Sequence, residues 1–459
     1  MTLSSVNNTP LRPFEPMVLD CLGESSAAIL KSPVGRQFPD LTAFAFYIRK
    51  ANLQKLEAAF TSDEIRLGRG LCFHIAPANI PVNFAFTWVF SLLAGNANIV
   101  RLPSKDFPQV DALLTIIKDT LDKYPELKER NAFVKYPRTD NETTAAYCQM
   151  ADCRMIWGGD RTIASIKALP TKPRCVDVTF ADRYSVAIIG AEAILKADDA
   201  QIARLAQDFY NDTYLMDQNA CSSPQVILWE RGNVALNHEI HETHENVGKW
   251  GSGEVEKLGS SSEALAKEES GEVGKLGSSS EALAKEESGE VEKLGSSSEA
   301  LAKEESGEVG KAKERFWNAV YELAERKYVL QDAVAVDKYT LFCEEAAGND
   351  NIQSIKRKGN LLYRVELKSL PPDIVLHRGK AGFFFEYALG NRQELISVIT
   401  EKFQTITQFG IDAVEMARQI AAAHLRGIDR IVPIGKAMDI GVLWDGHDLI
   451  RELSRKIEA

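Results

Sequence analysis

The sequence predicts an α/β fold with a doubly wound parallel sheet followed by a second α/β domain. Apolar strand-type runs alternate with helix-type runs between residues 71 and 169, which is the pattern of strand–helix–strand units. Several of these runs end in glycine or proline turns. The chain has 459 residues with 45% hydrophobic and 26% charged residues, which suits a globular enzyme of two or three domains.

Composition argues against several other classes of protein. The longest nearly apolar run, residues 84–95, is too short to cross a bilayer, and the first residues show no secretion signal. The formal charge of −11 argues against nucleic acid as the main partner. Because the cysteines are sparse and lack paired spacing, the sequence predicts reduced thiols in the cytoplasm and no metal site. The seven cysteines are Cys21, Cys72, Cys148, Cys153, Cys175, Cys221 and Cys343.

The N-terminal half begins with a helix-type pattern at residues 41–60, followed by a buried-strand run at 71–76 and an apolar helix at 82–94. Asn79 lies in the turn between that strand and that helix. Sites form at such turns in open α/β sheets, so Asn79 is a candidate functional residue. The alternative is an asparagine that only caps the helix.

A second strand reaches Arg101 and is followed by Ser104 and Lys105, and an amphipathic helix spans residues 110–121. A third strand, at 153–157, runs into Trp157-Gly158-Gly159 and a helix at 161–169. A strand, a glycine turn and a helix can place a phosphate near a helix N-terminus, although the chain has no G-x-G-x-x-G motif. The alternatives are a plain turn at the glycines and solvated charges at Arg101 and Lys105.

Cys221 lies in a loop of small and polar residues, 217–225, between a helix at 202–211 and a strand-type run at 226–228. A thiol at such a junction is accessible to a substrate, whereas structural cysteines usually sit inside a periodic apolar pattern. Cys221 is therefore the candidate nucleophile.

Residues 253–306 contain an 18-residue segment three times, and the copies carry charges of −3, −2 and −3. With so few apolar residues, the repeats cannot bury a core, so we expect them to be disordered or marginally helical. Removing residues 250–311 would join residues 247–249 to 312–314 and restore one uninterrupted helix-type pattern through Arg326. The repeats are thus predicted to be an insertion at a surface site.

After the insertion, the sequence predicts helices at 312–327, 393–409 and 413–424, and a strand and a short helix at the end. An aromatic run at 382–387 contains Glu386. This carboxylate is a candidate for binding a cofactor ribose, with packing or a salt bridge as the alternative.

Four motifs together resemble the aldehyde dehydrogenase superfamily: residues 77–81 around Asn79, 95–101, 157–159, and 218–225 around Cys221. Within the superfamily, the chain is most similar to the LuxC-type acyl-CoA reductases, and residues 444–450 are similar to that family's C-terminus. The resemblance covers roughly residues 40–248 and 312–459.

The resemblance implies a role for each matching residue. Cys221 would attack an acyl thioester, and Asn79 would stabilise the oxyanion together with the Cys221 backbone N–H. The cofactor pyrophosphate would lie along Trp157, Gly158 and Gly159, and Arg101 would lie near the adenine ribose.

Two departures from the superfamily pattern refine this reading. Thr179 occupies the position of the glutamate base of hydrolytic aldehyde dehydrogenases, which favours reduction over oxidation to an acid. Where NAD-preferring members carry a carboxylate, Ser104 and Lys105 follow Arg101, and this favours NADPH.

The resemblance thus implies NADPH-dependent reduction of a long-chain acyl-CoA or acyl-protein thioester to a fatty aldehyde, as in bacterial bioluminescence. We expect a cofactor-binding domain at 1–181, completed by about 421–459, and a catalytic domain at 182–249 and 312–420. Expected partners are acyl-protein synthetase and acyl-transferase subunits, in a cytoplasmic oligomer. The alternatives are a reductase acting on other chain lengths, an oxidative dehydrogenase, and a non-catalytic subunit that binds a partner.

Overall fold

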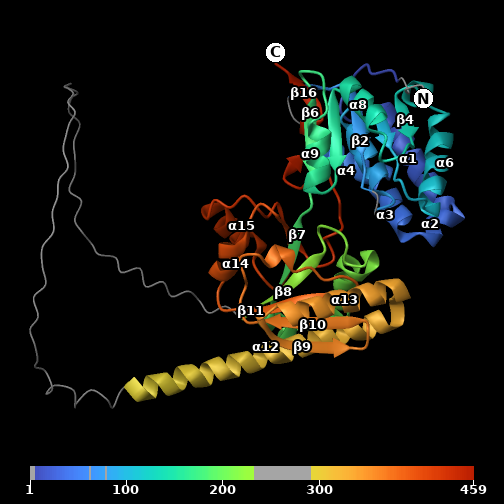
Figure 1. Cartoon of the computed structure of the whole chain (residues 1–459). Helices are drawn as coiled ribbons and strands as arrows, with labels where there is room; N and C mark the ends of the chain where they lie inside the picture. The colour runs from blue at the N-terminus through green and yellow to red at the C-terminus, as the bar shows by residue number, and fades with distance from the viewer. Residues whose placement is uncertain (1–5, 61–63, 78–79, 232–290, 459) are drawn as a thin grey trace, which may run out of the picture.

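The computed structural model describes residues 6–60, 64–77, 80–231 and 291–458, with only the backbone described for 291–306. Figure 1 shows two sheets, one above the other, with helices packed around each. The chain crosses from the first sheet to the second through residues 181–183.

The first sheet has five parallel strands in the order β4-β3-β2-β5-β6. The chain builds outward from β2 to β4 and then returns to the other side of β2, so the strand order reverses between β2 and β5. The predicted doubly wound sheet is therefore confirmed. Its strands are β2 (Leu71–Ile75), β3 (Ala97–Arg101), β4 (Asn131–Val134), β5 (Cys153–Trp157) and β6 (Val176–Phe180).

Helices cover both faces of this sheet, because its central strands are apolar on both sides and every residue of β2 and β3 is buried. One hydrophobic core contains side chains of α1, α3, α5 and α6, and a second core on the sheet contains side chains of α8. The helices of this half are α1 (Pro16–Lys31), α2 (Pro33–Gln37), α3 (Pro39–Tyr47), α4 (Lys50–Phe60), α5 (Asn83–Leu93), α6 (Pro108–Leu121), α7 (Pro125–Lys128), α8 (Asn141–Met150) and α9 (Asp160–Lys167).

The second sheet has seven strands in the order β13-β12-β7-β8-β11-β10-β9, and only the edge strand β9 is antiparallel to its neighbour. Its strands are β7 (Tyr184–Gly190), β8 (Pro224–Glu230), β9 (Ile352–Lys358), β10 (Leu362–Leu367), β11 (Phe383–Leu389), β12 (Phe403–Phe409) and β13 (Arg430–Pro433). The helices around it are α10 (Ala191–Lys196), α11 (Asp199–Asp212), α12 (Val291–Lys327), α13 (Asp332–Gly348), α14 (Arg392–Val398) and α15 (Ala413–Ala422).

After β13 the chain returns to the first half of the molecule. β16 (Ser454–Ile457) pairs antiparallel with β1 (Ile65–Gly68), and α16 (Leu449–Glu452) packs on α5. Between them, β14 (Leu443–Trp444) and β15 (His447–Asp448) form a tight hairpin. Residues near 445 are therefore brought to the junction between the two sheets.

Three predicted elements differ from the structure. The helix predicted at 393–409 is wrong beyond Val398, because Phe403–Phe409 is a strand, β12. The helix predicted at 41–60 is two helices, α3 and α4, separated at residues 48–49. The third repeat copy is helical from Val291, in the helix that extends away from the body in Figure 1, whereas residues 253–290 lie outside the described part of the chain.

Candidate active site

The loop that carries Cys221 is held firmly before it enters β8. Asp217 and Gln218 both have left-handed backbone conformations, with φ of 49° and 61°. The buried Gln218 amide donates to the carbonyls of Pro224 (3.2 Å) and Phe383 (2.9 Å), which ties the loop to β11. The sequence 217–225 thus forms a tight, anchored turn that fixes the position of the cysteine.

Cys221 is partly buried, and its carbonyl oxygen accepts a hydrogen bond of 2.7 Å from the Ser185 hydroxyl. Burial raises the pKa of the Cys221 thiol, and the carboxylates of Asp182 and Asp445 raise it further. The backbone N–H of Arg183 and the Arg378 guanidinium act in the opposite direction. Burial and the two carboxylates therefore disfavour the thiolate in the free protein.

The cysteine lies at the edge of the second sheet that faces the first sheet. β6 ends at Phe180 and β7 begins at Tyr184, so the carboxyl edge of the first sheet adjoins the amino edge of the second. Pro224, at the start of β8, is in register with Ser185 of β7, which places Cys221 at this same amino edge. The carboxyl ends of parallel strands are where open α/β sheets bind ligands.

All of the predicted cofactor residues except Glu386 lie at the carboxyl edge of the first sheet. Arg101 ends β3 and lies in register with Ile75 of β2. Its guanidinium is 4.6 Å from the centre of the Tyr136 ring, and Ser104 and Lys105 follow as exposed residues. The side chains of Ser104 and Lys105 are therefore free to contact a ligand at this end of the strand.

Trp157, Gly158 and Gly159 follow β5, beside the point where the strand order reverses. The Trp157 ring stacks on Phe180 at 3.8 Å, and its buried indole N–H has no hydrogen-bond partner among the described residues. A side chain at Gly158 would press on Thr162, whereas Gly159 is open and caps α9. An open glycine at a helix start and an unpaired donor suit a bound dinucleotide.

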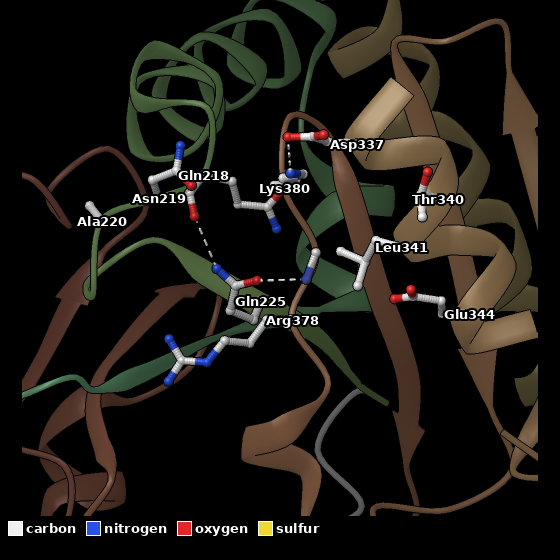
Figure 2. Close-up of a pocket in the computed structure, with 11 residues that line it drawn as sticks. Gln218, Asn219, Ala220, Gln225, Asp337, Thr340, Leu341, Glu344, Arg378 and Lys380 are labelled. Carbon is white, nitrogen blue, oxygen red and sulfur yellow. Dashed lines mark hydrogen bonds and ion pairs between the residues drawn. The ribbon is translucent and has the colours of Figure 1, made fainter. Parts of the chain in front are cut away.

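A pocket of about 520 Å³ opens beside the cysteine loop. Figure 2 shows it between residues 218–220, the α13 side chains and the segment 378–380. Gln225 spans its floor, since it donates to the Gln218 carbonyl (3.1 Å) and accepts from the Gly379 N–H (3.0 Å). The pocket gives a second approach to the loop that carries the cysteine.

The structure has the fold of aldehyde dehydrogenases. Aldehyde dehydrogenase 21 from Physcomitrella patens superimposes with a TM-score of 0.59 at 12% identity, covering 96% of this chain and 85% of the other. A NAD-dependent benzaldehyde dehydrogenase from Corynebacterium glutamicum gives 0.52 at 12% identity, covering 96% and 82%. The bifunctional proline utilization A protein gives 0.55 at 13% identity, but the chain spans only 42% of its length. The predicted fold class is confirmed.

In sequence, residues 49–247 match the family described as acyl-CoA reductase (LuxC). The predicted resemblance to LuxC is confirmed. The matched segment includes Cys221 and the carboxyl edge of the first sheet. A search of curated proteins finds no matching relative.

One residue that the LuxC resemblance singles out cannot be placed. Asn79 lies outside the described residues, and its role as an oxyanion donor stays a prediction. No group of metal-ligating side chains occurs in the described part of the chain, and no described helix is long and apolar enough to cross a membrane.

Glu386 is buried in the second half of the chain, so its predicted contact with a cofactor ribose is corrected. The residue is 2% exposed within β11. Its carboxylate accepts from the indole N–H groups of Trp229 (2.9 Å) and Trp317 (2.8 Å) and from Arg364 Nε (2.7 Å). These donors come from the core of the second half, and they leave the carboxylate no approach to a ribose.

Three residues near the cysteine had no predicted role: Arg183, Arg378 and Asp445. Asp445 lies in the segment 444–450, which is similar to the C-terminus of the LuxC family, and Arg183 lies within the region 40–248 that the resemblance covers, but neither pattern predicts that the two residues pair. The left-handed turn at Asp445 and Gly446 (φ of 53° and 79°) is the one local signal, because a D-G pair favours such a turn.

Proposed function

We propose that this protein reduces a long-chain fatty acyl thioester to a fatty aldehyde with NADPH, through an acyl-enzyme on Cys221. The observation that carries the proposal is the position of Cys221, at the amino edge of the second sheet, facing the carboxyl edge that holds Arg101 and Trp157. The LuxC match over residues 49–247 supports the acyl-CoA reductase class.

In the proposed reaction, the Cys221 thiolate attacks the acyl carbonyl, a new thioester forms on Sγ, and the donor thiol leaves with the proton of Cys221. Asn79 and the Cys221 backbone N–H would donate to the oxyanion. When bound, NADPH supplies the hydride that reduces the acyl group to the aldehyde level. Departure of the aldehyde returns the free cysteine. Thr179 provides no carboxylate base for water, so hydrolysis of the acyl-enzyme is disfavoured.

Arg101, Ser104 and Lys105 would receive the 2′-phosphate of NADPH, and Trp157, Gly158 and Gly159 would lie along the pyrophosphate. The exposure of Ser104 and Lys105 and the open space at Gly159 support this placement. We further propose the domain division at residues 181 and 182, which coincides with the crossing between the sheets.

A cytoplasmic, oligomeric enzyme that receives acyl groups from an acyl-protein synthetase and an acyl-transferase, as in bioluminescence, is part of the same proposal. All seven cysteines are free, which agrees with a reducing compartment. Reduction of another acyl chain length in another pathway is the second candidate, because the acyl chain can approach the anchored loop from the 520 Å³ pocket or from the cleft.

The test is consumption of NADPH with a panel of acyl-CoA thioesters of increasing length, with the aldehyde detected directly. We expect aldehyde from the wild-type protein, a preference for long chains, and no aldehyde from Cys221→Ala. Unconsumed NADPH with every donor, including acylated partner protein, would reject the reductase and favour a non-catalytic subunit.

A further inference from the structure

Asp212 is a buried carboxylate that the proposed reaction does not use. It is the last residue of α11 and is 1% exposed. Its two carboxylate oxygens accept hydrogen bonds from the backbone N–H groups of Gly435 (2.6 Å) and Ala437 (3.0 Å), which follow β13. A buried charge is tolerated only when it is paired or hydrogen-bonded, so these two bonds matter to both partners. Asp212 therefore ties the segment 435–439 to α11.

The same residue also holds the cysteine loop. The Asp212 carbonyl oxygen accepts a hydrogen bond of 2.7 Å from the Ser223 hydroxyl. Ser223 is fully buried and lies two residues after Cys221. Asp212 is thus bonded to two segments that are far apart in the sequence, the loop that carries the cysteine and the segment 435–439.

Arg430, on β13, fixes the segment 435–439 through its carbonyl groups. The guanidinium of this arginine donates to the carbonyl oxygens of Lys436 (3.1 Å), Ala437 (3.1 Å) and Asp439 (3.2 Å). The backbone of the segment is therefore bonded twice over, through its N–H groups to a carboxylate and through its carbonyls to a cation.

This fixed segment brings Met438 to the cysteine loop. Met438 is partly buried, and its Sδ lies 3.6 Å from the hydroxyl oxygen of Ser222. Ser222 directly follows Cys221 and is 3% exposed, whereas Cys221 itself is only partly buried. A polarizable, apolar side chain therefore borders the loop at the residue next to the candidate nucleophile.

We propose that Asp212 is a positioning residue of the cysteine site, which holds Met438 in place as one wall of the approach to Cys221. The inference rests on the proposed function only in taking Cys221 as the nucleophile. A wall at this position limits the size of the groups that reach Sγ, because a packed side chain is displaced only with loss of its contacts. Met438 then discriminates among acyl donors by the bulk next to their carbonyl.

The experiment compares the rates at which N-methylmaleimide and the larger N-cyclohexylmaleimide modify Cys221 in the full-length protein, by mass spectrometry of the Cys221 peptide. Both reagents react with the same thiolate, so the ratio of their rate constants does not depend on the pKa of the thiol. The ratio therefore reports the space around Sγ. Cys343, exposed on α13, is the reference within each sample, and its ratio should stay constant.

Two single variants and their combination test the wall. Met438→Ala removes the wall itself, whereas Asp212→Asn keeps the shape of the anchor but sets an amide NH₂ against a backbone N–H. We expect each to raise the ratio of the larger to the smaller reagent by about fivefold, because steric exclusion at Sγ is relieved. The double variant should show no further rise, because Asp212 acts through Met438.

Glu386→Gln is the matched control, since it also replaces a buried carboxylate of the second half with an amide. The Glu386 carboxylate accepts from Trp229, Trp317 and Arg364, none of which belongs to the cysteine loop or to the segment 435–439. Its ratio should stay within about twofold of the wild-type ratio. A rise equal to that of Asp212→Asn would show that loss of stability alone opens the site, and would overturn the proposal.

An unchanged ratio in Met438→Ala, or a rise there without one in Asp212→Asn, would also overturn the proposal. Melting temperatures verify that each variant is folded. If Asp212→Asn does not fold, Ser223→Ala takes its place, because it breaks only the bond between the cysteine loop and the Asp212 carbonyl; an unchanged ratio in that variant would have the same meaning. Because alkylation needs no NADPH and no acyl donor, the inference can hold even if the reductase assay fails.

Discussion

Glu386 is a buried carboxylate that holds three donors from three elements of the second half. Trp229 on β8, Trp317 on α12 and Arg364 on β10 all donate to it, and Arg364 is itself 4% exposed. A buried charge is tolerated only when it is paired and hydrogen-bonded. The side chain therefore joins α12 to the sheet.

Replacing Glu386 with Gln removes the negative charge and places an amide donor against other donors. We expect the free energy of unfolding to fall by about 3 kcal/mol, because the Arg364 cation loses its buried partner. Urea denaturation measures the change. Glu192→Gln, in an exposed pair with Lys196 on α10, is the control and should cost less than about 0.5 kcal/mol. A similar small loss in Glu386→Gln would contradict the assigned role.

Local pattern was sufficient to place a residue between two elements. Cys221 was expected in a loop between a helix and a strand, and the structure has it between α11 and β8, whereas its role as the nucleophile stays a prediction. Glu386 was misassigned because its partners lie up to 157 positions away in sequence. Asp445 and Arg183 are 262 positions apart, so no local pattern could have revealed their pairing.

At the scale of elements, β12 is a parallel strand between β7 and β13 that was predicted as a helix. Five of its seven residues are aromatic or β-branched, which favours a strand when neighbouring strands are available. The helix of residues 392–398 ends shortly before it in the sequence, and a helix-type pattern extends over both elements. Pairing with β7 and β13, which the sequence pattern alone does not reveal, makes this segment a strand.

β12 also contains a buried threonine hydroxyl that a valine would replace with a methyl group. The Thr407 hydroxyl is buried and has no hydrogen-bond partner among the described residues. Thr407→Val keeps the shape of the side chain and removes the free-energy cost of burying an unpaired hydroxyl. We therefore expect the free energy of unfolding to rise by about 1 kcal/mol. Thr340→Val, on the exposed side of α13, should change stability by less than about 0.5 kcal/mol. Destabilisation by Thr407→Val would indicate a partner for the hydroxyl.

The contact of α13 with the sheet depends on a buried lysine. Lys338 is fully buried and donates to the carbonyls of Asn360 (2.9 Å) and Ala381 (2.7 Å). Its Nζ lies 4.3 Å from the centre of the Tyr363 ring. Ala381 follows the pocket segment 378–380, so Lys338 helps to fix the wall of the pocket.

Burial lowers the pKa of Lys338 to about 7, from an ordinary value near 10.5. Between these pH values the unfolded chain binds the additional proton, so the stability of the folded protein should rise with pH. Relative to Lys338→Met, the wild-type free energy of unfolding should increase by about 2 kcal/mol between pH 7 and pH 9. Urea denaturation at both pH values measures this. A constant difference would mean that the carbonyls and the ring keep the ammonium charged.

At the scale of the whole molecule, the chain contributes to the junction from three separate regions: the crossing at 181–183, the cysteine loop at 217–225 and the hairpin around Asp445. The order of strand–helix units predicted the first sheet, because each unit is local in sequence. The seven-stranded sheet was less predictable, since β7 and β8 pair with strands that follow the insertion.

The third repeat copy, from Val291, forms one end of α12, and the other end of this helix is part of the core. The buried face of α12 is formed by residues after the third copy, among them Val309, Ala312, Phe316 and Trp317. In Figure 1, the helix runs outward from these residues, away from both sheets. If the repeats are an insertion with no part in folding or chemistry, removing them should leave the core face of α12 intact.

We therefore expect a chain lacking residues 253–306 to fold and to retain its activity. Its melting temperature should stay within about 2 °C of the full chain, because no buried contact of the described core is lost. Reduction of the best acyl-CoA should proceed with kcat/KM within about twofold. The formal charge should change from −11 to −3, which earlier elution from an anion exchanger verifies. A larger fall in melting temperature would show that the repeats pack on the protein. A loss of turnover with acylated partner protein, but not with acyl-CoA, would instead identify them as a tether.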